Sequence, residues 1–250
     1  MRKRVFECVG DVYASADLHF GHRNIIKYCH RSFLSDRDKR ILAENGGKWH
    51  TGTWKGGNAY PHSPSKESVE IMDETLLHNI NKTVPANGIL FLLGDFAMPG
   101  RDYDYLTRCK YYRSRINCEK IYFLFGNHDG AELESLFDIP EAHGQKFYDC
   151  VPHAIINKVQ FFLSHYSNVV WNKSHRTAIQ LYGHSHSEAE PWVDKNMPGH
   201  RSMDVGIDNA AKILGEYRPF KFSEIIDIMN KRNGHNIGDH HINRNAPEEV

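Results

Sequence analysis

Seven side chains that can bind a metal ion follow short apolar segments of the sequence. They are imidazole, carboxylate and amide groups, and the set contains no thiolate. A structural zinc ion takes four such ligands, so seven donors are more than one ion of that kind needs. The spacing therefore predicts a site for two ions, formed by Asp17, His19, Asp95, Asn127, His165, His184 and His186.

Seven donors suit two ions that share a carboxylate ligand. Asp95 is the natural bridge, since each of its two oxygens can bind one ion. Ions bridged in this way lie about 3.5–4 Å apart and can hold a hydroxide between them as the nucleophile. Nitrogen and oxygen donors without thiolate favour two divalent ions over calcium or an iron–sulfur cluster; manganese comes first, with iron, zinc, nickel or cobalt as alternatives.

Five apolar segments end just before these donors, and each is predicted to be a strand. Short continuous apolar runs are typical of buried strands. In an open α/β sheet, binding sites form at the carboxyl ends of the strands. Periodicity alone therefore predicts an open α/β sheet with strands at residues 12–16, 89–93, 121–125, 159–163 and 178–182, and one more at 203–206.

The remaining segments are predicted to be helices, one irregular insertion and a tail. A glycine-rich insertion is expected at about 36–66, although its first part, 36–45, has helical character. Pro64 marks the start of the next helix, and Ser223 caps the last one. The tail at 233–250 is expected to be mobile. Helices are expected at residues 23–30, 66–81, 101–119, 131–137 and 223–231.

The composition is typical of a globular chain with a single domain, expected at residues 1–232. The 250 residues are 40% hydrophobic and 25% charged, and 17 histidines strengthen the metal hypothesis. Basic and acidic residues number 31 each, so the bulk charge gives no reason to expect a nucleic-acid or membrane partner. The five cysteines form no Cys-x-x-Cys pair, and neither a signal peptide nor a membrane span is apparent. We therefore expect a cytoplasmic protein, while the oligomeric state stays open.

The order of these motifs resembles that of the calcineurin-like metallophosphoesterase superfamily. The similar motifs are Asp17-x-His19, Gly94-Asp95, Gly126-Asn127-His128-Asp129, His165 and Gly183-His184-x-His186. The resemblance covers about residues 12–186. A small bacterial and phage branch of predicted phosphoesterases in that superfamily is similar also at Asp17-Leu18-His19-Phe20-Gly21-His22, at Asn24 and at Asp204-Val205-Gly206-x-Asp208.

The resemblance implies a fold and a role for each of these residues. The implied fold is a four-layer α/β/β/α sandwich, in which two mixed sheets are flanked by helices. His128 would donate a proton to the leaving oxygen, and Asp129 would orient its ring. Asp95 would bridge two ions, the first also held by Asp17, His19 and His186, and the second by Asn127, His165 and His184.

The chemistry of these side chains supports the implied roles independently. Two ions neutralise the phosphate and supply a nucleophile at neutral pH. A histidine outside the ligand set can protonate the departing alkoxide, which is typically worth ~10²–10⁴ in rate. A neighbouring carboxylate raises the pKa of such a histidine, so that it stays protonated.

The motifs also bear on the substrate. Serine/threonine protein phosphatases of this superfamily have glutamate at the position of Asp129. They also have Asp-Arg-Gly after the Gly-Asp motif, whereas in this chain Phe96 follows that motif. The Gly-Asn-His-Asp form is common in its phosphodiesterases and nucleases, so we expect hydrolysis of a phosphodiester such as a nucleotide or cyclic nucleotide. His22, Arg23 and Asn24 are expected to bind substrate phosphate; helix capping and surface charge are the alternative.

Two further functions stay open on the sequence. Basic residues alternate with tyrosines over 101–119, a pattern that can bind nucleic acid and would suit a nuclease acting on single-stranded DNA or RNA. The neutral overall charge argues against that function. A non-catalytic metal-binding scaffold is the other candidate, and the presence of His128 argues against it because a scaffold needs no proton donor.

Overall fold

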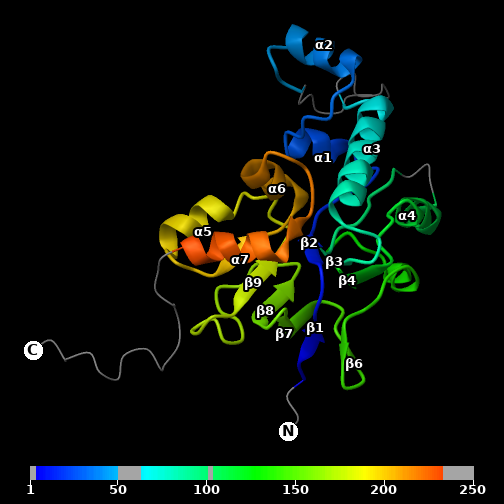
Figure 1. Ribbon diagram of the computed structural model, residues 1–250. Helices are drawn as coiled ribbons and strands as arrows, with labels where there is room; N and C mark the ends of the chain where they lie inside the picture. Colours follow the sequence, from blue (N-terminus) through cyan, green and yellow to red (C-terminus); the bar gives the residue numbers. More distant parts are fainter. Residues whose placement is uncertain (1–3, 50–62, 101–103, 233–250) are drawn as a thin grey trace, which may run out of the picture.

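The computed structural model describes residues 4–49, 63–100 and 104–232. Within these residues the chain is a mixed α/β fold with two mixed sheets (Figure 1). The centre of the predicted insertion at 36–66 and the predicted tail at 233–250 therefore lie outside the described residues.

The larger sheet has five strands. Its order is β1 (Phe6–Cys8), β7 (Cys150–Ile156), β8 (Val159–Ser164), β9 (Ile179–Tyr182) and β10 (Ser202–Asp204). β7 and β8 are antiparallel, whereas the other neighbours are parallel. The carboxyl ends of β8, β9 and β10 therefore lie at one edge of this sheet.

The smaller sheet has four strands. Its order is β11 (Phe220–Lys221), β2 (Val12–Ser15), β3 (Ile89–Leu93) and β4 (Lys120–Leu124). β2, β3 and β4 are parallel, and β11 is antiparallel to β2. Two short strands, β5 (Glu141–Ala142) and β6 (Gln145–Lys146), form a separate antiparallel pair. The carboxyl ends of β2, β3 and β4 therefore also meet at one edge.

Helices flank the two sheets (Figure 1). In the described part of the chain they are α1 (Arg23–Tyr28), α2 (Asp36–Glu44), α3 (Lys66–Thr83), α4 (Tyr105–Ser114), α5 (Glu190–Asn196), α6 (Ile207–Leu214) and α7 (Phe222–Lys231), with a 3₁₀ helix, η1 (Ala131–Ser135). In Figure 1, α3 and α4 lie on the side of β3 and β4, whereas α5 and α7 lie on the side of β9. None of the helices in these ranges has the length and apolar content that crossing a bilayer requires.

Alternate side chains of the smaller sheet enter two different cores. Phe91 and Leu93 of β3 pack in a cluster that also contains side chains of β7, β8 and β9. Leu90 and Leu92 point the other way and pack with α3 and α4. This is the period of two that an extended strand imposes. One core is therefore shared by both sheets, and the other lies under the helices.

The five main predicted strands are confirmed with small shifts of their ends, but the single open sheet is wrong. β8 and β9 join a second sheet because β8 pairs with β7 and β9 pairs with β8, and neither pairs with β2, β3 or β4. Periodicity indicates which faces of a strand are buried, but not which strand it pairs with. β7 is absent from the prediction because Pro152 and His153 interrupt its apolar pattern.

α3 confirms the helix expected to begin at residue 66, but Pro64 is not its first residue, and tertiary contacts give the reason. The helix begins after Ser65, whose hydroxyl accepts from the Ser68 N–H at 3.2 Å. Asp38 of α2 holds this turn, since its carboxylate accepts from the Ser65 N–H and the Ser68 hydroxyl, both at 2.6 Å. A contact between two helices therefore decides where α3 starts.

α5 and α6 are absent from the prediction, and α7 and α4 differ from it. α7 begins one residue before Ser223, so Ser223 lies in its first turn and is not the cap. Instead, the carboxylate of Glu224 accepts from the Lys221 N–H at 2.8 Å. The helix expected over 101–119 is the shorter α4, and residues 101–103 lie outside the described part.

Replacing a buried isoleucine of the shared core should cost much more stability than replacing an exposed one. Ile179 of β9 is fully buried, whereas Ile213 of α6 is 42% exposed. We expect Ile179→Ala to lower the free energy of unfolding by about 2–5 kcal/mol, because it leaves a cavity. Ile213→Ala should change it by less than about 1 kcal/mol. Urea denaturation of both variants measures the difference, and equal losses would contradict a core shared by the sheets.

Candidate metal centre

The parallel strands bring the predicted ligands to adjoining edges of the two sheets. Asp17, Asp95 and Asn127 follow β2, β3 and β4. His165 and His184 follow β8 and β9 in the same way. The Asp17 carboxylate accepts from the His184 N–H, at 3.0 Å to Oδ1 and 2.8 Å to Oδ2. This contact joins the end of a strand in one sheet to the end of a strand in the other.

The predicted ligands lie in two neighbouring groups. Within each group, one donor atom per residue lies within 4.8 Å of the others. The first group is Asp17, His19 and His186, and the second is Asp95, His165 and His184. Asn127 adjoins the second group, because its Oδ1 lies 3.0 Å from Nε2 of His165 and 2.9 Å from Nδ1 of His184. The structure therefore brings all seven predicted ligands together.

Asp95 lies between the two groups. Its Oδ2 is 3.5 Å from Nε2 of His19 in the first group and 3.6 Å from Nε2 of His165 in the second. Two ligand atoms bound tetrahedrally about 2.1 Å from one ion are separated by about 3.4 Å, so both distances suit shared coordination. The His128 N–H donates to the other oxygen, Oδ1, at 3.0 Å and fixes the carboxylate.

The second group contains lone pairs that face each other. Nδ1 of His165 lies 2.8 Å from the carbonyl oxygen of Leu93, so in the neutral ring Nδ1 carries the proton and Nε2 a lone pair. That lone pair faces Oδ1 of Asn127 at 3.0 Å, and an amide oxygen is also an acceptor. A cation between them satisfies both atoms. The donors of the second group therefore fit a divalent metal ion.

The first group has an unsatisfied histidine. Both ring nitrogens of His19 are buried and have no hydrogen-bond partner among the described residues. Such an orphaned polar group costs about 1–3 kcal/mol. Burial, followed by the charge of Arg31, holds the pKa of His19 well below its ordinary value, so the ring is neutral and can act as a ligand. The first group therefore also fits a metal ion.

Five of the seven predicted ligands have a left-handed backbone. Their φ values are 56° for Asp17, 51° for His19, 55° for Asp95, 65° for His184 and 47° for His186. This conformation costs a residue other than glycine roughly 1–2 kcal/mol. Local strain of this kind concentrates at functional sites. The backbone therefore holds these side chains in place at some cost to stability.

Gly94 and Gly126 allow the ends of β3 and β4 to approach closely. Gly94 has a φ of +91°, and a Cβ there would lie 2.5 Å from Nδ1 of His165 and 2.7 Å from Cα of Gly126. A Cβ on Gly126 would clash with the carboxylate of Asp95. The absence of both side chains therefore leaves the room in which Asp95 and His165 meet.

Arg31 and Asp208, which the predicted site does not include, support His186. Nδ1 of His186 lies 2.7 Å from Oδ2 of Asp208, which leaves Nε2 available for a metal ion. The Arg31 guanidinium donates to the same carboxylate at 2.8 and 2.9 Å and to the carbonyl oxygen of Asp17 at 2.7 Å. Burial would raise the pKa of Asp208, but Arg31 and His186 outweigh it and lower that pKa to about 2. The similarity at Asp204-Val205-Gly206-x-Asp208 is a sequence signal for Asp208, whereas Arg31 has none.

The predicted role of Asp129 as the residue that orients His128 is wrong. Its carboxylate accepts from three backbone N–H groups, those of Asp95 at 2.7 Å, Phe96 at 3.0 Å and Gly126 at 2.8 Å. The turn after β4 folds the short side chain back onto the backbone, so both oxygens are already occupied. Asp129 therefore fixes the turns after β3 and β4, and with them the position of Asp95.

His128 is exposed at the edge of the metal centre. Its ring centroid lies 5.6 Å from that of His19. No side-chain hydrogen bond to its ring is present within the described ranges. The ring can therefore reach a bound molecule, and its role as proton donor stays a prediction.

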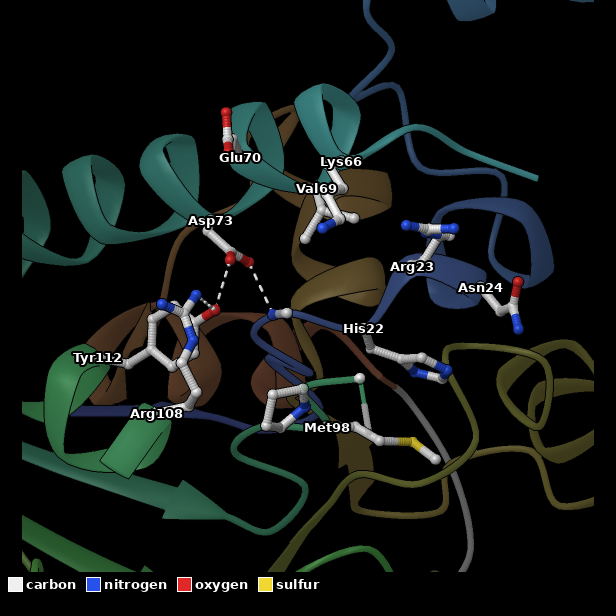
Figure 2. Close-up of a pocket in the computed structure, with 13 residues that line it drawn as sticks. His22, Arg23, Asn24, Lys66, Val69, Glu70, Asp73, Met98, Arg108 and Tyr112 are labelled. Carbon is white, nitrogen blue, oxygen red and sulfur yellow. Dashed lines mark hydrogen bonds between the residues drawn. The ribbon is translucent and has the colours of Figure 1, made fainter. Parts of the chain in front are cut away.

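The three predicted substrate-binding residues, His22, Arg23 and Asn24, line one cavity of about 440 Å³ (Figure 2). The ring centroid of His22 lies 5.4 Å from that of His19, so the cavity adjoins the first ligand group. Asp73 of α3 forms part of its wall and accepts from the Gly21 N–H at 3.0 Å and the Tyr112 hydroxyl at 2.8 Å.

Comparisons with known proteins leave the family open. No protein-family model matches the sequence. The uncharacterized protein MJ1445 of Methanocaldococcus jannaschii is 23% identical over 227 residues, which cover 88% of this chain and 92% of that protein. A crystal structure of AQ665 from Aquifex aeolicus, a protein of unknown function, has a TM-score of 0.49 at 17% identity and covers 87% of this chain and 98% of that one.

The pKa of Asp73 predicts a pH-dependent contribution to stability. Burial raises this pKa to about 6, although the two hydrogen bonds oppose the change. A carboxyl whose pKa is higher in the folded than in the unfolded protein contributes fully below the unfolded pKa, about 4, and its contribution is lost as the pH rises through about 6. Between pH 4 and pH 7 we expect the wild type to lose on the order of 2–3 kcal/mol relative to Asp73→Asn. Urea unfolding of the metal-free proteins measures this, and parallel pH profiles would contradict it.

Proposed function

We propose that the protein is a two-metal phosphoesterase of the calcineurin-like metallophosphoesterase superfamily that acts on phosphodiesters. The position of Asp95, with one oxygen between His19 and His165, is the observation that carries the proposal. The four-layer α/β/β/α sandwich of that superfamily belongs to the proposal as well. The core that contains side chains of both sheets supports it.

Each ligand group would hold one divalent ion. Asp95 would belong to both, together with Asp17, His19 and His186 for the first ion and Asn127, His165 and His184 for the second. When bound, the two ions supply charge neutralisation at the phosphate and a water of lowered pKa as the nucleophile. The donor set suits manganese first, with iron, zinc, nickel or cobalt as alternatives.

The residues around these ligands would position them and move a proton. His128 would protonate the departing oxygen, since its exposed ring lies beside His19 and its backbone N–H binds Asp95. Asp129 would act through the backbone and keep Asp95 between the two groups. Asp208 would keep Nδ1 of His186 protonated, so that Nε2 faces the ion.

The contacts of two arginines at the end of α4 favour hydrolysis of a small phosphodiester over the nuclease alternative. Arg115 pairs with Glu74 through both of its terminal nitrogens. Arg113 donates to the carbonyl oxygens of Ile116 and Glu119, both at 3.1 Å. A track for a nucleic-acid strand needs cations directed at phosphates, and these two are bound within the protein. Salt-dependent binding of single-stranded DNA would favour the nuclease instead.

The proposal is tested with model substrates after manganese loading. We expect turnover of bis-p-nitrophenyl phosphate that exceeds turnover of the monoester p-nitrophenyl phosphate. The number of bound ions is measured on the same sample by elemental analysis. Two bound ions without turnover of either ester would contradict the catalytic function and favour a metal-binding scaffold.

His128→Ala should separate proton donation from metal binding. We expect it to retain both ions and to lower turnover of an alkyl phosphodiester by roughly 10²–10⁴, because general acid catalysis is lost. The loss should be much smaller with p-nitrophenolate, which departs without a proton. His78→Ala, at an exposed position of α3, is the matched control and should leave turnover unchanged. Equal losses with both leaving groups, or loss of metal, would show that His128 has another role.

A further inference from the structure

The cavity that adjoins His22 has the size and lining of a binding pocket. Its volume of about 440 Å³ lies within the range of small-molecule sites, about 300–1,000 Å³. It lies between α1, α3, α4 and the segment after β3 (Figure 2). Because the ring of His22 is 5.4 Å from that of His19, a molecule that reaches the metal centre can extend into this cavity.

Positive charge predominates in the lining. Arg23 of α1, Lys66 of α3 and Arg108 of α4 all line the cavity. In Figure 2, Arg108 and Arg23 lie on opposite sides, with Lys66 between them at the start of α3. Neither Arg23 nor Lys66 forms an ion pair with another residue of the described ranges. Arg23 and Lys66 can therefore act on a bound anion, and Arg108 lies across the cavity from Arg23.

The acidic residues of the lining cancel only part of this charge, since two carboxylates, Glu70 and Asp73, line the cavity with three cations. Both oxygens of Asp73 accept hydrogen bonds from within the protein, one from Gly21 and one from Tyr112. The carboxylate of Glu70 points away from the other labelled side chains in Figure 2. The net effect favours an anionic ligand.

Arg108 is held in position by its neighbours. Its guanidinium donates to the hydroxyl of Tyr112 at 2.7 Å and lies 4.9 Å from the centroid of the same ring. The Tyr112 hydroxyl in turn donates to Asp73 at 2.8 Å. A guanidinium that is already oriented loses little freedom on binding, and its planar fork suits phosphate.

Apolar side chains form another part of the lining. Val69 of α3 contributes, as do Met98 and Pro99 from the segment after β3, and the Met98 side chain is 37% exposed. A pocket for inorganic phosphate alone has no need of such a surface. The lining therefore suits an organic group that carries an anion.

We infer that this pocket binds the organic part of a phosphodiester that carries a second phosphate, and that Arg23, Lys66 and Arg108 bind this second phosphate. The inference rests on the proposed function, since the metal centre would hydrolyse the first phosphate. It narrows the substrate class to diesters of nucleoside bisphosphates and compounds of similar size and charge.

A pair of chromogenic substrates tests the inference. Thymidine 5′-(p-nitrophenyl phosphate) is compared with the same compound bearing a 3′-phosphate. Water adds to the same phosphorus in both, the bond to the aryl oxygen breaks, and p-nitrophenolate departs. We expect kcat/KM of the manganese-loaded protein to be roughly tenfold higher for the 3′-phosphorylated compound, because its second phosphate gains charge-assisted hydrogen bonds from the pocket.

Charge-removing variants assign the effect to the pocket. Lys66→Gln and Arg23→Gln should each reduce the preference for the 3′-phosphate to about threefold or less, as one of three cations is lost. Lys195→Gln, at an exposed position of α5, is the matched control and should keep the full preference. Circular dichroism and the melting temperature check that each variant is folded. A preference that persists unchanged in both pocket variants would overturn the assignment.

Binding by the metal-free protein separates this inference from the proposed function. By calorimetry, thymidine 3′,5′-bisphosphate should bind roughly tenfold more tightly than thymidine 5′-monophosphate, and Lys66→Gln should reduce the difference to about threefold or less. Equal affinities together with equal kcat/KM values would overturn the pocket and leave the phosphoesterase proposal intact. Absence of turnover with a retained affinity difference would overturn the phosphoesterase proposal and leave the anion pocket intact.

Discussion

Four aspartates buried where the two sheets meet determine the electrostatics of the candidate centre. Asp17, Asp95, Asp204 and Asp208 are each at most 6% exposed, and Arg31 is a buried cation beside them. Arg31 pairs with Asp208. Burial raises the pKa of Asp17 well above its ordinary value, and the charges of Asp204 and Asp95 add to this effect. Buried carboxylates are stable when they are paired or bind metal ions, so this excess of negative charge favours divalent cations.

The surrounding structure holds these carboxylates in place against their repulsion. Asp129 accepts from three N–H groups of the turns after β3 and β4, which fixes the backbone of Asp95. Arg31 binds both the Asp208 carboxylate and the Asp17 carbonyl oxygen, and so ties the start of α6 to the end of β2. The left-handed conformations at five predicted ligands are tolerated because such contacts stabilise them. Stability is given up locally for a fixed arrangement of donors.

The ligand positions could be predicted from the sequence because each follows a strand with a clear apolar pattern. The carboxyl ends of parallel strands meet, so side chains such as Asp95 and Asn127 become neighbours although 32 positions separate them in the chain. The apolar pattern does not show which strands pair with each other. For this reason the sequence predicted one open sheet instead of two sheets. The role of Asp129 was missed because its spacing does not reveal whether a side chain turns to a ring or to the backbone. Arg31 was missed because its partner Asp208 lies 177 residues away.

The central claim is that Asp95 bridges two metal ions, one in each ligand group. A crystal structure of the manganese-loaded protein, with anomalous diffraction data collected near the manganese edge, tests it most directly. The account predicts two anomalous peaks about 3.5–4 Å apart, on either side of the Asp95 carboxylate. One peak would lie beside His19 and His186, and the other beside His165 and His184. A single peak, or peaks that do not share Asp95, would contradict the account.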